Sequence, residues 1–196
     1  PLDKAIELGL ILERSLLVRK MREYDLKYVL LEGSLIVGPD LDLILAVEDF
    51  IKKNDVKIML DLFCGTGSLT KVALVNGVKE CICVDFSKDS IRIARENLKG
   101  FEDRVHLIRA DVFSFKFQNI SVFDLVVADP FIELSYKVAK QLSPFYSKIS
   151  KAFILTIGFI EDKYWCERVL RELKAHFKTI EILNRGRLIQ AICKHS

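Results

Sequence analysis

The sequence predicts an α/β fold in which a mainly parallel, seven-stranded sheet is covered by helices on both faces. Two observations lead to this prediction. Between residues 56 and 158, five short apolar runs alternate with stretches of helical periodicity, and strands that alternate with helices form doubly wound parallel sheets. Two further strand-like runs, separated by a short turn, close the chain. They predict an antiparallel pair at one edge of the sheet.

Each element can be placed by its apolar pattern and its flanking residues. Strands are expected at 56–63, 81–86, 105–110, 123–129, 152–158, 178–183 and 187–193, and helices at 68–76, 88–99, 134–142 and 162–175. Ahead of them we expect a helix at 3–20, a hairpin at 28–37 and a helix from Asp40, as its cap, to about residue 53. The predicted organisation is an N-terminal helix-and-hairpin extension, residues 1–40, followed by one main domain, residues 41–196.

Composition limits the class of protein. Of the 196 residues 51% are hydrophobic and 29% are charged, which predicts a folded domain and excludes a disordered chain. The formal net charge of +3 neither demonstrates nor excludes a nucleic-acid partner. Five cysteines, an odd number without a disulfide framework, indicate a reducing compartment. With no apolar run of membrane-spanning length and no signal-peptide pattern at the start, we expect a cytoplasmic protein.

The most informative segment is a buried strand followed by a glycine turn and the start of a helix. Gly65 and Gly67 allow a ligand to approach the backbone closely, and the helix offers free N–H groups at its start. A dinucleotide fingerprint would need a third glycine at the position of Thr70. Asp61 lies where it can receive a cationic amine, and a pyrophosphate would disfavour a carboxylate there. The pattern therefore favours a nucleoside that carries an amino acid over NAD.

Four segments in this order resemble the motifs of class I S-adenosylmethionine-dependent methyltransferases. They are Asp61–Gly67, Cys83–Ser87, Arg109–Phe113 and Asp124–Phe131, each at the end of an expected strand. The resemblance implies a Rossmann-like methyltransferase fold with S-adenosyl-L-methionine as cofactor. It implies that Asp85 binds the ribose hydroxyls and Asp111 the adenine amine, with Phe86 either on the adenine face or in the core. The implied cofactor-binding residues are Asp61, Phe63, Gly65, Thr66, Gly67, Asp85, Phe86, Asp111 and Val112.

The fourth segment points to the methyl acceptor. Asp129-Pro130-Phe131 resembles the (Asp/Asn)-Pro-Pro-(Tyr/Phe) turn of enzymes that methylate exocyclic or amide nitrogens, with one proline fewer. In that turn an oxygen accepts the N–H bonds of the target amine and the aromatic ring stacks on a flat substrate. The sequence is most similar to the ribosomal-RNA guanine-N2 methyltransferase family. The resemblance implies catalytic roles for Asp129, Pro130 and Phe131. The alternative interpretation of Asp129-Pro130 is a simple turn after a buried strand.

The partner expected from this resemblance is RNA. Short basic clusters could contact its phosphates, although such clusters are also typical of solvated surfaces; the candidate contacts are Arg19, Lys20, Arg22, Arg185 and Arg187. Two alternatives remain open at the level of sequence. The first is a methyltransferase for a small molecule or a protein, and the second is a cofactor-binding module without catalysis. No metal is expected, because the cysteines and histidines form no ligand set.

Overall fold

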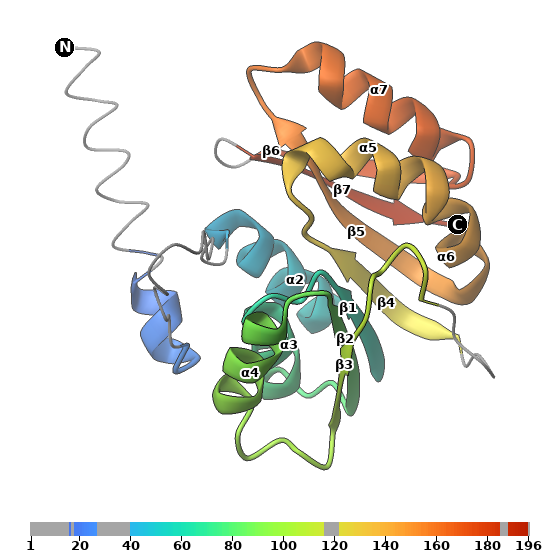
Figure 1. The fold of residues 1–196 in the computed structure, drawn as a ribbon. Coiled ribbons are helices and arrows are strands. Elements are labelled where there is room, and N and C mark those ends of the chain that lie inside the picture. The colour runs from blue at the N-terminus through green and yellow to red at the C-terminus, as the bar shows by residue number, and fades with distance from the viewer. Residues whose placement is uncertain (1–15, 17, 27–39, 116–121, 185–187, 196) are drawn as a thin grey trace, which may run out of the picture.

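The computed structural model describes residues 16, 18–26, 40–115, 122–184 and 188–195. Its strands form one seven-stranded sheet in the order β3-β2-β1-β4-β5-β7-β6 (Figure 1). The first five pair in parallel, and β7 lies antiparallel between β5 and β6. The strands are β1 (Ile58–Leu62), β2 (Glu80–Asp85), β3 (Val105–Arg109), β4 (Phe123–Ala128), β5 (Ser150–Phe159), β6 (Thr179–Asn184) and β7 (Leu188–Lys194). The predicted fold class and the antiparallel edge are confirmed.

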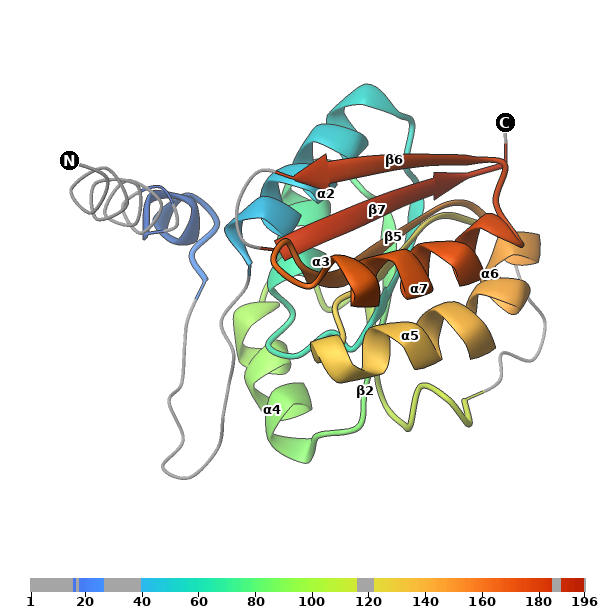
Figure 2. The ribbon, with the colours of Figure 1, turned by 90° about the horizontal axis from the view of Figure 1, so that it is seen from above.

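Helices cover both faces of the sheet, as the view from above shows (Figure 2). One face carries α2 (Leu41–Lys53), α3 (Ser68–Val75) and α4 (Lys88–Asn97), which bury their apolar sides in one core cluster. The other carries α5 (Ile132–Gln141), α6 (Ser143–Ile149) and α7 (Lys163–Lys174), which share a second cluster. Because both faces are buried, the central strands are mostly apolar; every residue of β4 is buried.

Among the described elements, two departures from the expected bounds exceed two residues. The short helix α6 was not expected; Pro144 lies in its first turn, where a missing N–H costs nothing. The N-terminal helix continues to residue 23, three residues beyond the expected end. Most of the 3–20 helix, the 28–37 hairpin and the turn at 185–186 lie outside the described residues, so the division of the chain at residue 40 stays a prediction.

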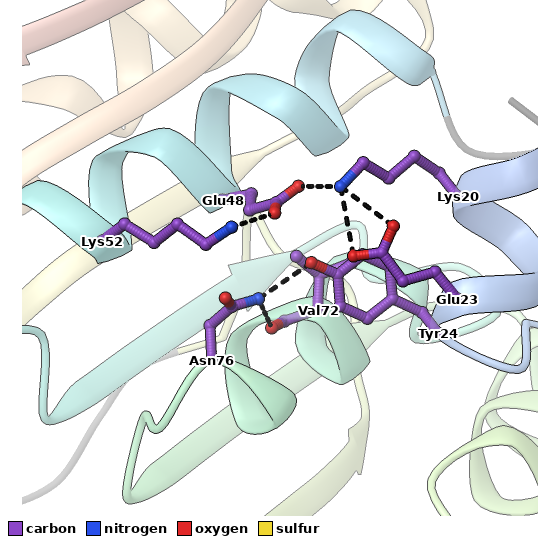
Figure 3. A network of polar contacts seen from close by, with 7 residues as sticks. All are labelled: Lys20, Glu23, Tyr24, Glu48, Lys52, Val72 and Asn76. Carbon is purple, nitrogen blue, oxygen red and sulfur yellow. Dashed lines mark hydrogen bonds and ion pairs between the residues drawn. The ribbon is translucent and has the colours of Figure 1, made fainter. Parts of the chain in front are cut away.

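The described N-terminal residues dock against α2 and α3 (Figure 3). The Lys20 ammonium donates to Glu48 Oε2 at 2.6 Å, and the other oxygen of this carboxylate accepts from Lys52. Asn76 at the end of α3 donates to the Tyr24 hydroxyl at 3.0 Å. Glu48 is only 4% exposed, so its negative charge depends on these two lysines.

Parallel strands bring their carboxyl ends to one edge of the sheet, where ligands of doubly wound folds bind. In register, Leu62 pairs with both Val84 and Ala128. The residues that follow β1, β2 and β4 therefore meet at this edge. Among the described helices, none has the length and apolar character to cross a membrane.

Candidate functional site

The glycine turn between β1 and α3 forms the centre of the edge. Gly65 and Gly67 both have positive φ, +52° and +76°. A Cβ atom on Gly67 would lie 3.0 Å from Leu98 Cδ1, so this glycine is needed for close packing against α4. A Cβ atom on Gly65 would meet only the Phe63 carbonyl oxygen, at 3.9 Å. Gly65 therefore leaves its side open for the close approach of a ligand.

Asp61 lies within β1 and is 1% exposed. Burial raises the pKa of Asp61 to about 7, and the charges of Asp129 and Asp85 contribute to the rise. Hydrogen bonds from Thr70 act in the opposite direction and lower this pKa. The Thr70 hydroxyl donates to Asp61 Oδ2 at 2.7 Å. Thr70 occupies the position where a dinucleotide fingerprint would have its third glycine. At this position its hydroxyl holds the carboxyl group of Asp61. A cation at this edge would favour the ionised form.

Asp85 ends β2 and holds the glycine turn in place. Its Oδ2 atom accepts from the Gly65 amide and its Oδ1 atom from the Ser87 amide, both at 2.8 Å. Because each carboxylate oxygen has two acceptor positions, Asp85 keeps capacity for ligand hydroxyl groups. The neighbouring Phe86 is 72% exposed. It is therefore not a core residue, the alternative that the sequence left open.

Thr66 has an internal role in the turn. Its hydroxyl pairs with Ser68 Oγ at 3.0 Å, and its carbonyl oxygen accepts from Asn97 Nδ2 at 2.8 Å. Asn97, 2% exposed at the end of α4, was not found from the sequence. It lies 31 residues away in an ordinary amphipathic pattern, which carried no signal for this contact.

The segment after β3 contacts the residues beside the glycine turn. Val112 is 3% exposed, whereas Asp111 is exposed and accepts from the Phe113 amide at 3.0 Å. The Phe63 ring meets the Phe113 ring edge to face, with centroids 5.9 Å apart. Lys137 Nζ on α5 lies 3.8 Å from the centroid of the Phe113 ring, so the segment after β3 also contacts α5.

Asp129 follows the last residue of β4 and is half-buried. Burial raises its pKa to about 6, the Thr156 hydroxyl lowers it, and the charge of Asp40 raises it further. Its charge also raises the pKa of Asp61, as expected for neighbours at the ends of paired strands. Pro130 is buried, and Phe131 is 59% exposed at the start of α5. The edge thus combines a carboxyl group that ionises near neutrality with an exposed aromatic ring.

The basic residues that the sequence offers as phosphate contacts are not all free to make them. Lys20 is held by Glu48 and Glu23, while Arg19 and Arg22 are exposed. Arg185 and Arg187 lie outside the described residues. The described part of the chain contains no group of three metal-ligating side chains. Two surface hollows, one of about 270 Å³ on α7 and one of about 300 Å³ between Phe50 and Lys151, are not lined by the acids of this edge.

Comparison with known proteins finds relatives among transferases. A family model described as "Methyltransferase domain" matches residues 53–192. The chain is 32% identical over 103 residues to the release factor glutamine methyltransferase of Clostridium acetobutylicum, covering 50% of this chain and 36% of that protein. It is 29% identical over 142 residues to the ribosomal protein L11 methyltransferase of Thermotoga neapolitana, covering 72% and 50%. The chain thus spans half or less of the length of these relatives.

The fold also resembles solved structures. The 16S rRNA N2 G1207 methyltransferase of T. thermophilus, solved in complex with AdoMet and guanosine, superposes with a TM-score of 0.62 at 17% identity. The superposition covers 84% of this chain and 45% of that one. At this identity the likeness concerns the fold.

Proposed function

The chain belongs to the methyltransferase-domain family, and from that premise we propose that this S-adenosylmethionine-dependent methyltransferase acts on an exocyclic amine of a nucleobase in RNA. S-adenosyl-L-methionine supplies a sulfonium methyl group that is already electrophilic. The protein then has to bind the cofactor and hold the amine in line with that methyl group.

The residues at the strand ends fit this cofactor. Asp61, a buried carboxyl group whose pKa is raised to about 7, suits the cationic amine of the amino-acid part. Gly65 offers an open backbone for close approach, and Asp85 suits the two ribose hydroxyls. We assign three residues that follow β2 and β3 to the adenine. Exposed Phe86 and buried Val112 would contact its ring, and Asp111 would bind its amino group. Phe63, Thr66 and Gly67 shape the turn.

The observation that carries the proposal is the position of Asp129 beside Asp61. Their strands pair in register up to Leu62 and Ala128, and the charge of Asp129 raises the pKa of Asp61. A group held by Asp129 is therefore next to the proposed amino-acid subsite. With its pKa at about 6, Asp129 is mostly ionised at neutral pH and accepts the N–H bonds of an amine. This leaves the nitrogen lone pair available for attack on the methyl group.

Exposed aromatic side chains at the starts of α5 and α7 favour a flat substrate. Phe131 is 59% exposed and Tyr164, at the start of α7, is 72% exposed. The Arg168 guanidinium lies 5.9 Å from the Tyr164 ring centroid and 4.5 Å from that of Tyr136. Aromatic rings combined with a guanidinium group are typical of surfaces that stack on unpaired bases. We assign Phe131 to the target base and the Tyr164–Arg168 pair to a neighbouring nucleotide.

A protein substrate is the second candidate. The named substrates of the two relatives above are a release factor glutamine and a ribosomal protein. A glutamine amide is also a flat NH₂ group, so the chemistry assigned to Asp129 serves it equally well. The observation against it is the exposed aromatic surface, which a single amide group does not require.

A labelling experiment tests the proposal. The protein is incubated with radiolabelled S-adenosylmethionine and separate pools of unmodified ribosomal-RNA transcripts, DNA, ribosomal proteins and small molecules. We expect label in RNA, located by nucleoside analysis on an exocyclic amine. Label in the protein pool would favour the second candidate. Cofactor binding without transfer to any pool would indicate a non-catalytic module.

A further inference from the structure

Phe63, the residue between β1 and the glycine turn, departs from the alternation of its strand. Successive side chains of a strand point to opposite faces of the sheet. Met59 belongs to the core cluster on the α3 face and Leu62 to the cluster on the α5 face, while Asp61 bonds to Thr70 of α3. Phe63 should therefore follow Asp61 to the α3 face. It packs instead against the cluster on the α5 face.

The backbone of Phe63 explains this reversal. Its φ is +61°, in the left-handed region that a Cβ atom disfavours, and a bulky residue there calls for an explanation. Within the described part of the chain, Asp25 is the only other non-glycine residue with a positive φ. Such conformations are stable only where surrounding contacts hold them, and they cluster at ligand sites.

Contacts from two other segments hold the Phe63 ring on the α5 face. The Phe113 ring meets it edge to face, with centroids 5.9 Å apart and planes at 63°. Lys137 Nζ lies 3.8 Å from the centroid of Phe113 and holds this second ring by a cation–π contact. The Phe113 amide also donates to Asp111 Oδ1 at 3.0 Å. Phe63 is therefore tied to the turn after β3 and, through Phe113, to α5.

The opposite position of the ring would obstruct the proposed cofactor site. With an extended backbone, the Phe63 side chain would point to the face on which Asp61 lies, and Asp61 is the residue assigned to the cationic amine. The backbone of Gly65, two residues further on, is open to a ligand, since a Cβ atom there would have only the Phe63 carbonyl oxygen as a neighbour, at 3.9 Å. An aromatic ring on this side would compete with the cofactor for that space.

We propose that Phe113 is a positioning residue for cofactor binding, which holds the Phe63 ring on the α5 face and so keeps the amino-acid subsite open. Lys137 supports Phe113 from α5. The inference rests on the cofactor subsites of the proposed function and deepens them, and it is independent of the methyl acceptor. The competing interpretation is a direct contact of Phe113 with the adenine, because Asp111 and Val112 come just before it in the chain.

Glycine at position 63 distinguishes these two interpretations. Phe63→Gly removes the ring and also the unfavourable contact of a Cβ atom at positive φ, so Phe113 has nothing left to hold. Isothermal titration calorimetry with S-adenosylhomocysteine is applied to the parent, to Phe113→Ala, to Phe63→Gly and to the double variant. The control is Phe145→Ala on α6, which also loses an edge-to-face contact, with Tyr146 at 5.2 Å between centroids. The stoichiometry of each titration gives the fraction of protein that is folded.

We expect Phe113→Ala to weaken binding by roughly tenfold, and to change Kd by less than about twofold once Phe63 is glycine, since residues in contact are energetically coupled. Phe145→Ala should bind like the parent. A folded Phe113→Ala protein with the parent's affinity would overturn the proposal. So would an equal loss in the two backgrounds, which would indicate that Phe113 contacts the adenine directly.

Lys137→Met tests the same arrangement with a variant that should fold, because the side chain is exposed. Loss of the cation–π contact should weaken S-adenosylhomocysteine binding by about threefold. Lys140→Met, at another exposed lysine of α5, should leave the affinity unchanged. An unchanged affinity in Lys137→Met would remove Lys137 from the assignment.

Asp85→Ala, titrated in parallel, separates this inference from the site on which it rests. Weaker binding in both Asp85→Ala and Phe113→Ala supports both. Weaker binding in Asp85→Ala alone would leave the cofactor site in place and show that the role of Phe113 is wrong. Unchanged binding in both would show that the cofactor site itself is misplaced.

Discussion

The carboxylate of Asp85 accepts a hydrogen bond from the backbone amide of Gly65 at 2.8 Å. This contact joins the end of β2 to the glycine turn after β1, and so fixes the turn relative to the residue assigned to the ribose. The same side chain accepts from the Ser87 amide at the start of α4. One carboxylate therefore orients two of the segments proposed to surround the cofactor.

Replacing Asp85 should impair both the turn and the ribose contact. We expect Asp85→Ala to weaken binding of S-adenosylhomocysteine by roughly 1.5–3 kcal/mol, the usual contribution of hydrogen bonds to a charged group. Isothermal titration calorimetry measures the change, and the exposed acid Asp89, changed to Ala, serves as the control of equal charge. Unchanged affinity in a folded Asp85→Ala protein would move the cofactor site elsewhere.

The raised pKa of Asp61 predicts a pH dependence of cofactor binding. A cationic amine binds the ionised carboxylate, so affinity should rise with pH up to about 7 and then level off. Below that value it should fall by at most about tenfold per pH unit. Asp61→Asn should bind weakly with a flatter pH profile. Equal pH profiles for the parent and Asp61→Asn would show that another group receives the amine.

The same shift affects the stability of the ligand-free protein. A carboxyl group whose folded pKa lies above its unfolded value binds more protons in the folded state, so the free energy of unfolding should decrease as the pH rises from about 4 to about 7. Urea unfolding of the parent and of Asp61→Asn across this range isolates the contribution. A contribution of opposite sign would contradict the burial assigned to Asp61.

Glu48 should be important for docking of the N-terminal helix. Its ion pairs with Lys20 and Lys52 outweigh burial and lower its pKa, so their stabilisation is present above pH 4.5 and is lost as the pH falls through the lowered pKa. Glu48→Gln should reduce the free energy of unfolding by about 2–3 kcal/mol. The exposed partner of Lys20, Glu23, provides the matched control, since Glu23→Gln should cost less than about 1 kcal/mol. Equal losses would show that burial of Glu48 is unimportant.

Substitutions at Lys20 and at its two arginine neighbours should affect RNA binding differently. Arg19 and Arg22 are exposed, so replacing both with Ala should reduce the slope of log affinity against log salt by up to about 2. Lys20→Ala should mainly lower stability, because its ammonium group is held by Glu48. Filter binding at several salt concentrations gives the slopes. An unchanged slope in the double variant would remove this helix from the RNA-binding surface.

The sequence was sufficient for the fold and for the order of the strand-end residues. Alternating strands and helices, and the local strand–glycine–helix pattern around Gly65, depend on neighbouring residues. The family and the cofactor expected from the four motifs are confirmed by the family match over residues 53–192. Assignments of single residues such as Asp111 or Phe131 stay predictions.

What could not be predicted depends on contacts between distant segments. Asn97 reaches the carbonyl of Thr66, and Gln190 reaches Asp40 across 150 residues. Lys20, expected as an RNA contact, instead pairs with Glu48, 28 residues away. A basic residue in a short cluster looks the same in sequence whether its charge faces solvent or a buried carboxylate. Only the packing of the N-terminal helix against α2 distinguishes the two.

The central claim, that Asp129 holds the methyl-accepting amine beside the cofactor, is tested most directly by comparing binding with turnover in Asp129→Ala. Asp129 is assigned to the substrate, so affinity for S-adenosylmethionine should stay within about tenfold, roughly 1.4 kcal/mol. Turnover on the RNA labelled by the parent should fall by the order of 10² or more, because a positioning contact is lost. The exposed loop variant Asp103→Ala should match the parent in both. An Asp129→Ala protein that binds the cofactor and turns over like the parent would contradict the account.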